Sequence, residues 1–187
     1  MGIAIGVGVT IGIIMLLLLV LVGIYNGLVQ ARNRVDNGWS QIDVQLKRRH
    51  DLIPNLVETA KGYMKHEADT FKSITEARSK ALGANNIKDA SAAEGQLGAA
   101  LSQFLLTVEN YPDLKANQNF LSLQEELSST ENKISFSRQN YNDQVLGYNN
   151  KTDMFPSNIV AGMFNFTKRD FFEIENKEER EAPKVQF

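Results

Sequence analysis

The stretch IAIGVGVTIGIIMLLLLVLVGIY, residues 3–25, decides how this chain is organised, because it contains no charged side chain. A hydrocarbon core about 30 Å thick needs about 20 apolar residues in helical form, so this run is long enough to span a bilayer. A cleaved secretory signal would need a basic start, a shorter apolar core and a small-residue cleavage site. Only Met1 and Gly2 precede the run. We therefore expect an uncleaved transmembrane anchor over residues 1–27.

Four glycines in the anchor have a spacing that suits close packing of helices. Gly2 and Gly6 form one G-x-x-x-G pair, and Gly8 and Gly12 form a second. Such pairs let helix backbones approach closely in lipid, where packing drives association. Glycine is also common in membrane helices in general. The pattern therefore fits either a self-association face or ordinary membrane-helix composition.

Basic residues near one end of the anchor predict its orientation. Arg32 and Arg34 lie within ten residues of Tyr25, whereas the other side offers only the terminal amine. Lys and Arg are enriched on the cytoplasmic side of membrane helices. This bias places Met1 outside and the rest of the chain in the cytoplasm. The same two arginines are the best candidates to contact lipid headgroups.

The composition of the remaining residues, about 160 of them, fits one helical domain. The formal net charge of -2 and the lack of interleaved aromatic and basic residues give no indication of nucleic-acid binding. Without cysteine the chain has no disulfide or thiolate chemistry. Strand-like alternation is scarce, which favours an all-α fold.

Apolar spacing predicts three main helices after the anchor. The first covers residues 28–82, about 80 Å at 1.5 Å per residue, with a bend at Pro54 and a soft point at Gly62. The second starts at about Ser91 and ends before Pro112, and the third covers 117–150. The third helix repeats large apolar residues at strict sevens, which indicates a coiled-coil seam. These residues are Phe120, Leu127, Ile134, Tyr141 and Tyr148.

A short fourth helix is expected after Pro156, because proline suits the first helical position. Residues 165–187 are expected to form an extended tail. The predicted fold is therefore all-α, with a single transmembrane helix that continues into an antiparallel helical bundle over 28–164. In that bundle the first and third helices are long, the second is shorter and the fourth is short.

Helix lengths predict an apolar row that the chain itself does not cover. If the second helix returns along the first from its distal end, its roughly 20 residues cover only about 30 Å of an 80 Å rod. The third helix would then head away from the membrane. An uncovered row of that size marks an interface. We expect protomers to associate side by side through Val35, Trp39, Ile42 and Leu46, together with the glycine face, unless a kink at Pro54 folds the rod back on itself.

Arg49 is the most informative polar residue, because the heptad count from Leu46 and Ile53 places it on the apolar stripe. An unpaired buried charge costs several kcal/mol. We therefore expect an ion pair with an acid of the third helix, with Glu131 as first choice. A grip of the Lys47–Arg49 cluster on anionic lipid is the alternative. Distance disfavours it, because Lys47 lies about 33 Å beyond Tyr25 along a straight helix.

No constellation of residues predicts catalysis. His50 and His66 are the only histidines, and on one helix they would lie about 24 Å apart. The pair His66-Glu67 does not begin an H-E-x-x-H motif, since position 70 is Thr. A nucleophile elbow and a P-loop are also missing from the sequence. We expect no catalytic residue, no metal site and no cofactor.

Three segments resemble signature blocks of the LemA family. They are RRHDLIPNLV at 48–57 with the nearby KGY and HE at 61–63 and 66–67, YPDLKAN at 111–117 continuing to STENKI at 129–134, and FPSNIVA at 155–161. The resemblance covers nearly the whole chain, including the anchor. It implies a bacterial membrane-anchored protein with an antiparallel helical bundle and no established catalytic activity.

Two functions fit these observations. In the first, the protein is a non-enzymatic scaffold that self-associates at the bacterial inner membrane and organises or shapes the bilayer. In the second, it is an adaptor that presents a surface to an HtpX-like membrane metalloprotease or an envelope-stress system, an association that the family resemblance suggests. The alternation Pro183, Val185, Phe187 would suit addition of a strand to a partner's sheet edge, or a strap between subunits.

Overall fold

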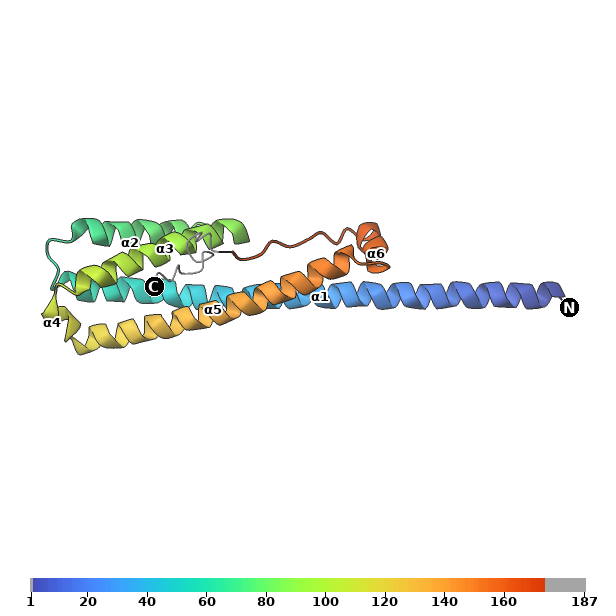
Figure 1. Cartoon of the computed structure of the whole chain (residues 1–187), viewed down its shortest axis with the longest axis horizontal. Coiled ribbons are helices and arrows are strands. Elements are labelled where there is room, and N and C mark those ends of the chain that lie inside the picture. Colours follow the sequence, from blue (N-terminus) through green and yellow to red (C-terminus); the bar gives the residue numbers. More distant parts are fainter. Residues whose placement is uncertain (1, 174–187) are drawn as a thin grey trace, which may run out of the picture. The chain divides into compact units, whose positions relative to one another are not determined.

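The computed structural model describes residues 2–173, and side chains from residue 5 onward (Figure 1). Within this range the regular elements are helices, and no strand occurs. Their bounds are α1 Gly2–Lys61, α2 Ala68–Leu82, α3 Ile87–Val108, α4 Pro112–Lys115, α5 Gln118–Asp153 and α6 Ser157–Met163. The described residues divide into two compact units. Unit 1 holds the chain up to Ser40 and Asn140–Arg169, and unit 2 holds Gln41–Gln139 and the residues from Asp170.

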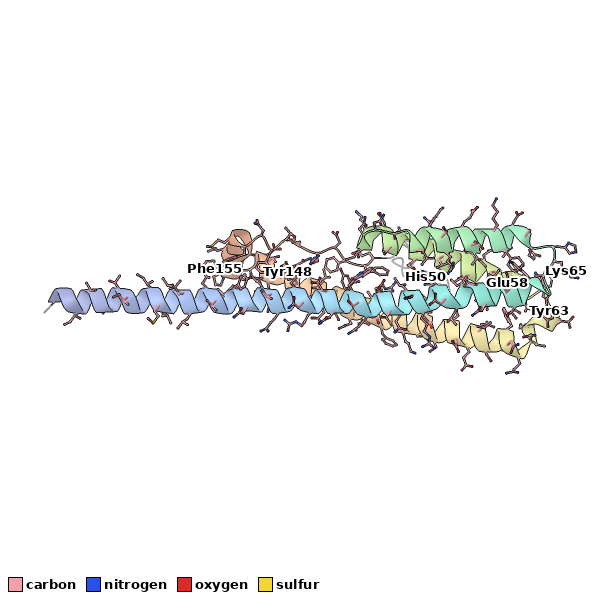
Figure 2. All side chains as sticks on the ribbon, turned by 180° about the vertical axis from the view of Figure 1, so that it is seen from behind. His50, Glu58, Tyr63, Lys65, Tyr148 and Phe155 are labelled. Carbon is pink, nitrogen blue, oxygen red and sulfur yellow. The ribbon has the colours of Figure 1, made fainter. Side chains whose placement is uncertain are left out.

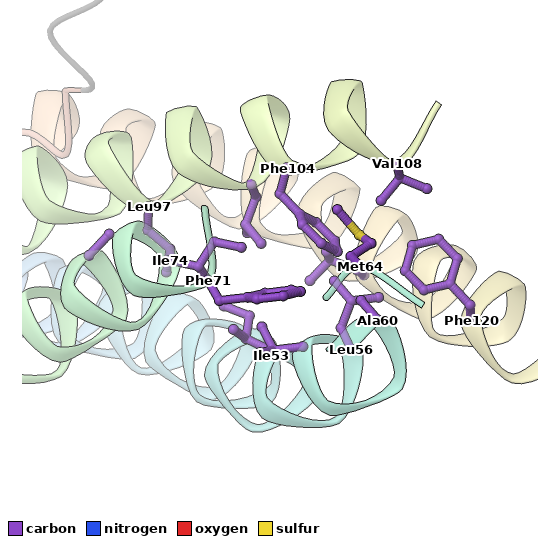
Figure 3. Packing of buried hydrophobic residues seen from close by; sticks show 14 of the residues in the cluster. Ile53, Leu56, Ala60, Met64, Phe71, Ile74, Leu97, Phe104, Val108 and Phe120 are labelled. Carbon is purple, nitrogen blue, oxygen red and sulfur yellow. The ribbon is translucent and has the colours of Figure 1, made fainter. Parts of the chain in front are cut away.

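Unit 2 is built on a core of large apolar side chains from α1, α2, α3 and α5 (Figure 3). The rings of Phe71 and Phe104 lie 6.2 Å apart, and Phe120 lies 6.2 Å from Phe104 on its other side. Phe104 and Leu97 have no exposed area. Burying a side chain of this size contributes about 1.5–3 kcal/mol. This core brings three helices onto the last part of α1.

The single helix predicted over residues 28–82 is in fact two helices. α1 ends at Lys61 and α2 begins at Ala68. The amides of Tyr63 and Met64 both donate to the carbonyl of Ala60, at 2.9 and 3.0 Å, which closes the last turn. Lysine in the last turn followed by glycine favours a helix end at this point. Gly62 is therefore a stop, whereas α1 continues through Pro54.

Side chains hold the connection between α1 and α2 in place. Met64 is almost fully buried in the core. The hydroxyl of Tyr111 donates to Glu67 Oε1 at 2.8 Å, and this hydrogen bond raises the pKa of Tyr111 above its usual value. Asn117 Nδ2 donates to the hydroxyl of Tyr63 at 2.9 Å. The turn thus joins the start of α5 to the end of α1.

The extra break changes the direction in which the later helices run. Arg78 Nε donates to the carbonyl of His50 at 2.8 Å, so α2 returns along α1. α3 then runs outward again, and α5 runs opposite to α1. Two contacts, Tyr63–Asn117 and Arg49–Glu131, show this last direction. From the first contact to the second, the residue number decreases along α1 and increases along α5, so the two helices are antiparallel. The sequence predicted that this long helix would run in the other direction.

Other predicted elements are close to the observed ones. α3 begins at Ile87, earlier than expected, because the Asn86 side chain accepts from the amide of Asp89 at 2.8 Å and caps the helix. The short α4 was not predicted. All five residues of the predicted heptad row in α5 are buried. Residues 165–173 form no helix, and the rest of the predicted tail lies outside the described residues.

A matched pair of leucines on α3 tests the core. Leu97 is buried and Leu106 is 66% exposed. We expect Leu97→Ala to lower the free energy of unfolding by about 2–5 kcal/mol, because it leaves a cavity. Leu106→Ala should change it by less than about 0.5 kcal/mol. Urea unfolding of the full chain in detergent, followed by circular dichroism, measures both. Equal losses for the two variants would contradict the packing described for unit 2.

Candidate functional site

The first part of α1 is apolar on every side and has no protein cover in the described structure. No residue of its most apolar 18-residue stretch is buried. A helix that is apolar all round belongs in a protein core or in a membrane. By length and composition it suffices to cross a bilayer. A Cβ added at Gly6, Gly8 or Gly12 would meet no atom within 4 Å, so these positions are open. Gly2 lies among the residues whose side chains are not described.

The prediction of an uncovered apolar row at Val35, Trp39, Ile42 and Leu46 is wrong. Three of the four side chains are buried, with exposures of 2%, 0% and 5% for Val35, Ile42 and Leu46. Trp39 is half-buried, and its ring lies edge-on to Tyr141 at 5.9 Å between centroids. The cause is the additional reversal at residues 62–67, which turns α5 back along α1. Side-by-side association through this row therefore has no structural basis.

The contact of α1 with α5 in unit 1 is close. A Cβ added at Gly38 would lie 3.3 Å from Tyr141 Cα, which is tighter than an ordinary contact. Tyr141, Val145 and Tyr148 of α5 are all fully buried or nearly so. Glycine at position 38 thus allows the two backbones to approach each other.

An aromatic cluster lies in unit 1 at the end of the apolar run of α1. The ring of Tyr25 meets those of Phe164 and Phe166 edge-on, at 4.9 and 5.7 Å between centroids. The guanidinium carbon of Arg32 lies 5.2 Å from the centre of the Phe166 ring, a cation–π contact. Arg34 is exposed. The predicted role of Arg32 and Arg34 at lipid headgroups stays a prediction.

Hydrogen bonds fasten the chain after α6 back onto α5. The hydroxyl of Tyr148 donates to the carbonyl of Thr167 at 2.9 Å. Asn149 donates to the carbonyl of Arg169 and accepts from its amide, both at 2.9 Å. Arg169 also pairs with Asp36 at 3.2 Å. Burial raises the pKa of Tyr148, and the positive charges of Arg169 and Arg32 oppose that rise. Figure 2 shows Tyr148 beside α1.

A charged cluster in unit 2 contains the predicted partner of Arg49. Arg49 Nη1 lies 2.9 Å from Glu131 Oε2, so the expected pair is present. Only its arginine is buried, because the side chain of Glu131 is 54% exposed. Glu94 of α3 is the deeper acid, 3% exposed. Its Oε2 lies 3.5 Å from Arg49 Nη1, and its Oε1 forms a 2.6 Å hydrogen bond with His50 Nε2.

Sequence reasoning missed Glu94, although its spacing carried a signal. Glu94 lies three residues before Leu97 and so continues the apolar stripe of α3 backward. That stripe continues through Leu101, Phe104 and Val108. A charged residue on such a stripe needs a buried partner, as was argued for Arg49.

The charged cluster ties helices together and is not arranged as a metal centre. Arg49 and His50 come from α1, Glu94 from α3 and Glu131 from α5. Figure 2 marks His50 on α1. Among the described residues no three His, Cys, Asp or Glu side chains converge to hold a metal ion. His66 is exposed in the connection between α1 and α2. Pro183, Val185 and Phe187 lie outside the described residues, so their predicted partner role stays a prediction.

Isosteric changes at the two glutamates compare what a buried charge and an exposed charge contribute to the free energy of unfolding. Glu94→Gln removes the only buried acid beside Arg49 and His50 among the described residues, and we expect a loss of about 3–5 kcal/mol in unfolding free energy. Glu131→Gln should cost about 1 kcal/mol or less, because water screens that acid. Urea unfolding of both variants measures the difference. A larger loss for Glu131→Gln would contradict the assignment of Glu94 as the central acid.

Comparison with known proteins places the chain in a family. The LemA family profile matches residues 38–187. Protein LemA of Metamycoplasma hominis is 32% identical over 142 residues, which are 75% of this chain and 64% of that protein. Magnetosome protein MamQ 2 of Paramagnetospirillum magneticum is 22% identical over 80% of this chain, and magnetosome protein MamQ of Magnetospirillum gryphiswaldense is 21% identical over 79%. The matches span 64% of the length of each of these relatives. On the family match and the first of these identities, this chain belongs to the LemA family.

Proposed function

We propose that this protein is a non-enzymatic helical scaffold anchored in the bacterial inner membrane by α1. The observation that supports this is the character of α1, an unbroken helix from Gly2 to Lys61. Its first part is apolar and uncovered, and its later part carries the buried residues onto which the other helices pack. Exposing such a segment to water costs about 25 cal/mol for each Å² of apolar surface, a cost that a bilayer removes.

The anchor passes into the packed part of the chain without a linker. From Leu28 onward the side chains of α1 begin to be buried by the rest of the chain, only three residues beyond Tyr25. A continuous hydrogen-bonded helix resists bending more than a flexible linker does. The parts of α5 and α6 that pack on α1 within unit 1 are thereby held at the membrane surface. We place them on the cytoplasmic side, because Arg32 and Arg34 follow the span.

The proposal explains the buried charges without assigning them to a reaction. Glu94 pairs with both Arg49 and His50 within unit 2. Buried ionic groups of this kind fix which helices pair and in which register. We propose this role for the cluster. The adaptor alternative depends on the tail, which lies outside the described residues, and stays a prediction.

The proposal also includes self-association. Because the row at Val35, Trp39, Ile42 and Leu46 is not left uncovered, we propose that association uses the anchor. The open positions at Gly6, Gly8 and Gly12 leave room for a second helix in lipid. Two of the relatives are named as magnetosome proteins. We propose that anchored copies of this chain organise or shape a membrane.

The anchor is tested with a charge at its centre. Leu17 is 61% exposed in the apolar run. We expect Leu17→Arg to reduce membrane integration, because an arginine at the middle of a span costs about 2.5–3.5 kcal/mol on insertion scales. Flotation of the full chain with vesicles after alkaline washing measures this. Leu146→Arg, at an exposed position of α5, is the control and should still float. A wild-type chain that is washed off the vesicles would refute the anchor.

Association is tested at the second glycine pair. We expect Gly8→Ile with Gly12→Ile to lower the mass of the detergent-solubilised full chain, because the larger side chains keep helix backbones apart. Gly8→Ala with Gly12→Ala keeps the positions small and should leave the mass unchanged. Light scattering in detergent measures the mass of each variant. A monomeric wild type, or the same mass in all three proteins, would refute association through this face.

A further inference from the structure

Large apolar side chains are exposed where α5 turns into α6. Phe155 is 80% exposed, and Figure 2 marks it at this turn. Four others are between 47% and 63% exposed. They are Met154, Ile159, Met163 and Phe164. The opposite face of α6 is buried through Val160 and Ala161. We call the five exposed residues the apolar corner.

The apolar corner lies beside the end of the candidate span, within unit 1. Phe164 stacks edge-on against Tyr25, the last residue of the apolar run. Val20 and Gly23 of α1 line one groove together with Lys151 and Ser157, which flank the turn before α6. The corner is therefore level with the last turns of the apolar run. It is not an isolated patch elsewhere on the molecule.

We propose that the apolar corner inserts into the bilayer surface from which α1 emerges, with lipid as its occupant. This inference rests on the proposed anchor. If α1 spans the bilayer, Tyr25 lies at the boundary between headgroups and acyl chains, where tyrosine is enriched. Side chains level with Tyr25 then meet the same boundary. Amphipathic elements at this boundary bury their apolar face about 5–10 Å deep, a depth that side chains of this size can reach.

The polar surroundings of the corner fit the same placement. Lys151 and Lys168 flank it and are exposed, and Lys168 pairs with Asp153 at 2.8 Å. Arg32, which follows the candidate span in sequence, lies over the ring of Phe166. Basic side chains next to an apolar face are typical of elements that lie on anionic membranes. The corner thus gives the chain a second attachment to the bilayer beside the span.

The absence of cysteine in the chain allows each position to be labelled uniquely. We choose Phe155→Cys and Ile159→Cys in the corner, Leu17→Cys in the anchor, and Leu146→Cys as the matched control. Leu146 is 51% exposed on α5 in unit 1, two turns before the corner. Each full-length variant carries a small fluorophore on its cysteine. The variants are reconstituted in vesicles that contain anionic lipid and lipids with a nitroxide on the acyl chain.

We expect quenching by the acyl-chain nitroxide at 17, 155 and 159 to be about threefold stronger than at 146, because only the first three sites lie among acyl chains. No quenching at 17 would refute the anchor itself. Quenching at 17 with equal, weak quenching at 155, 159 and 146 would refute the corner's insertion and leave the anchor standing. Burial of the fluorophore at 155 that does not depend on lipid and that increases with protein concentration would show that a second copy of the chain covers the corner. That result would overturn the proposal. Circular dichroism checks that each labelled variant is folded.

Discussion

The structure depends on one constraint, the continuity of α1. A helix satisfies its own backbone hydrogen bonds along its whole length, so it can pass from lipid to water without a change of conformation. What changes is the side-chain pattern. Up to Tyr25 the apolar residues surround the helix, and from Leu28 most of them lie on one buried stripe. The other helices pack on that stripe, so the uncovered apolar run and the packed stripe belong to one continuous helix.

Charge inside the packed part serves a different purpose from the apolar core. Glu94 and Arg49 are both almost fully buried, and such groups rarely add net stability compared with apolar residues of similar volume. They do make wrong arrangements costly, since a shift of α3 along α1 would leave a bare charge in the interior. The core drives α2 and α3 onto α1, and fixing the register of α3 is the role that we propose for the charged cluster.

Much of the fold was predictable because the relevant signals are local. The apolar run, the heptad row of α5 and the stop at Pro112 each depend on neighbours in sequence, and the structure contains all three. The Arg49–Glu131 pair was predictable because a charge on an apolar stripe demands a partner. The break after Lys61 is harder to predict, because Gly62 interrupts an apolar pattern that continues on both sides and so indicates only a soft point.

That one local error had a long-range consequence. The direction of every later helix depends on the number of reversals before it. Because one reversal was not predicted, α5 was predicted to run away from the apolar row of α1 that it in fact covers. Val35, Ile42 and Leu46 were expected to be bare and are buried. Glu94 was missed for a related reason, since its role follows from which helices face each other. Local patterns predict the helices well. Which helix faces stay uncovered depends on the number of chain reversals between the helices, and local patterns do not give that number reliably.

The contact between Trp39 and Tyr141 has a practical consequence. Trp39 is the only tryptophan in the chain, and it lies half-buried where α1 meets α5 in unit 1. The core of unit 2 contains phenylalanine and no tryptophan. The tryptophan emission of the protein is therefore a local optical signal, which responds when these two helices separate in unit 1 and stays largely unchanged when only the core of unit 2 loosens.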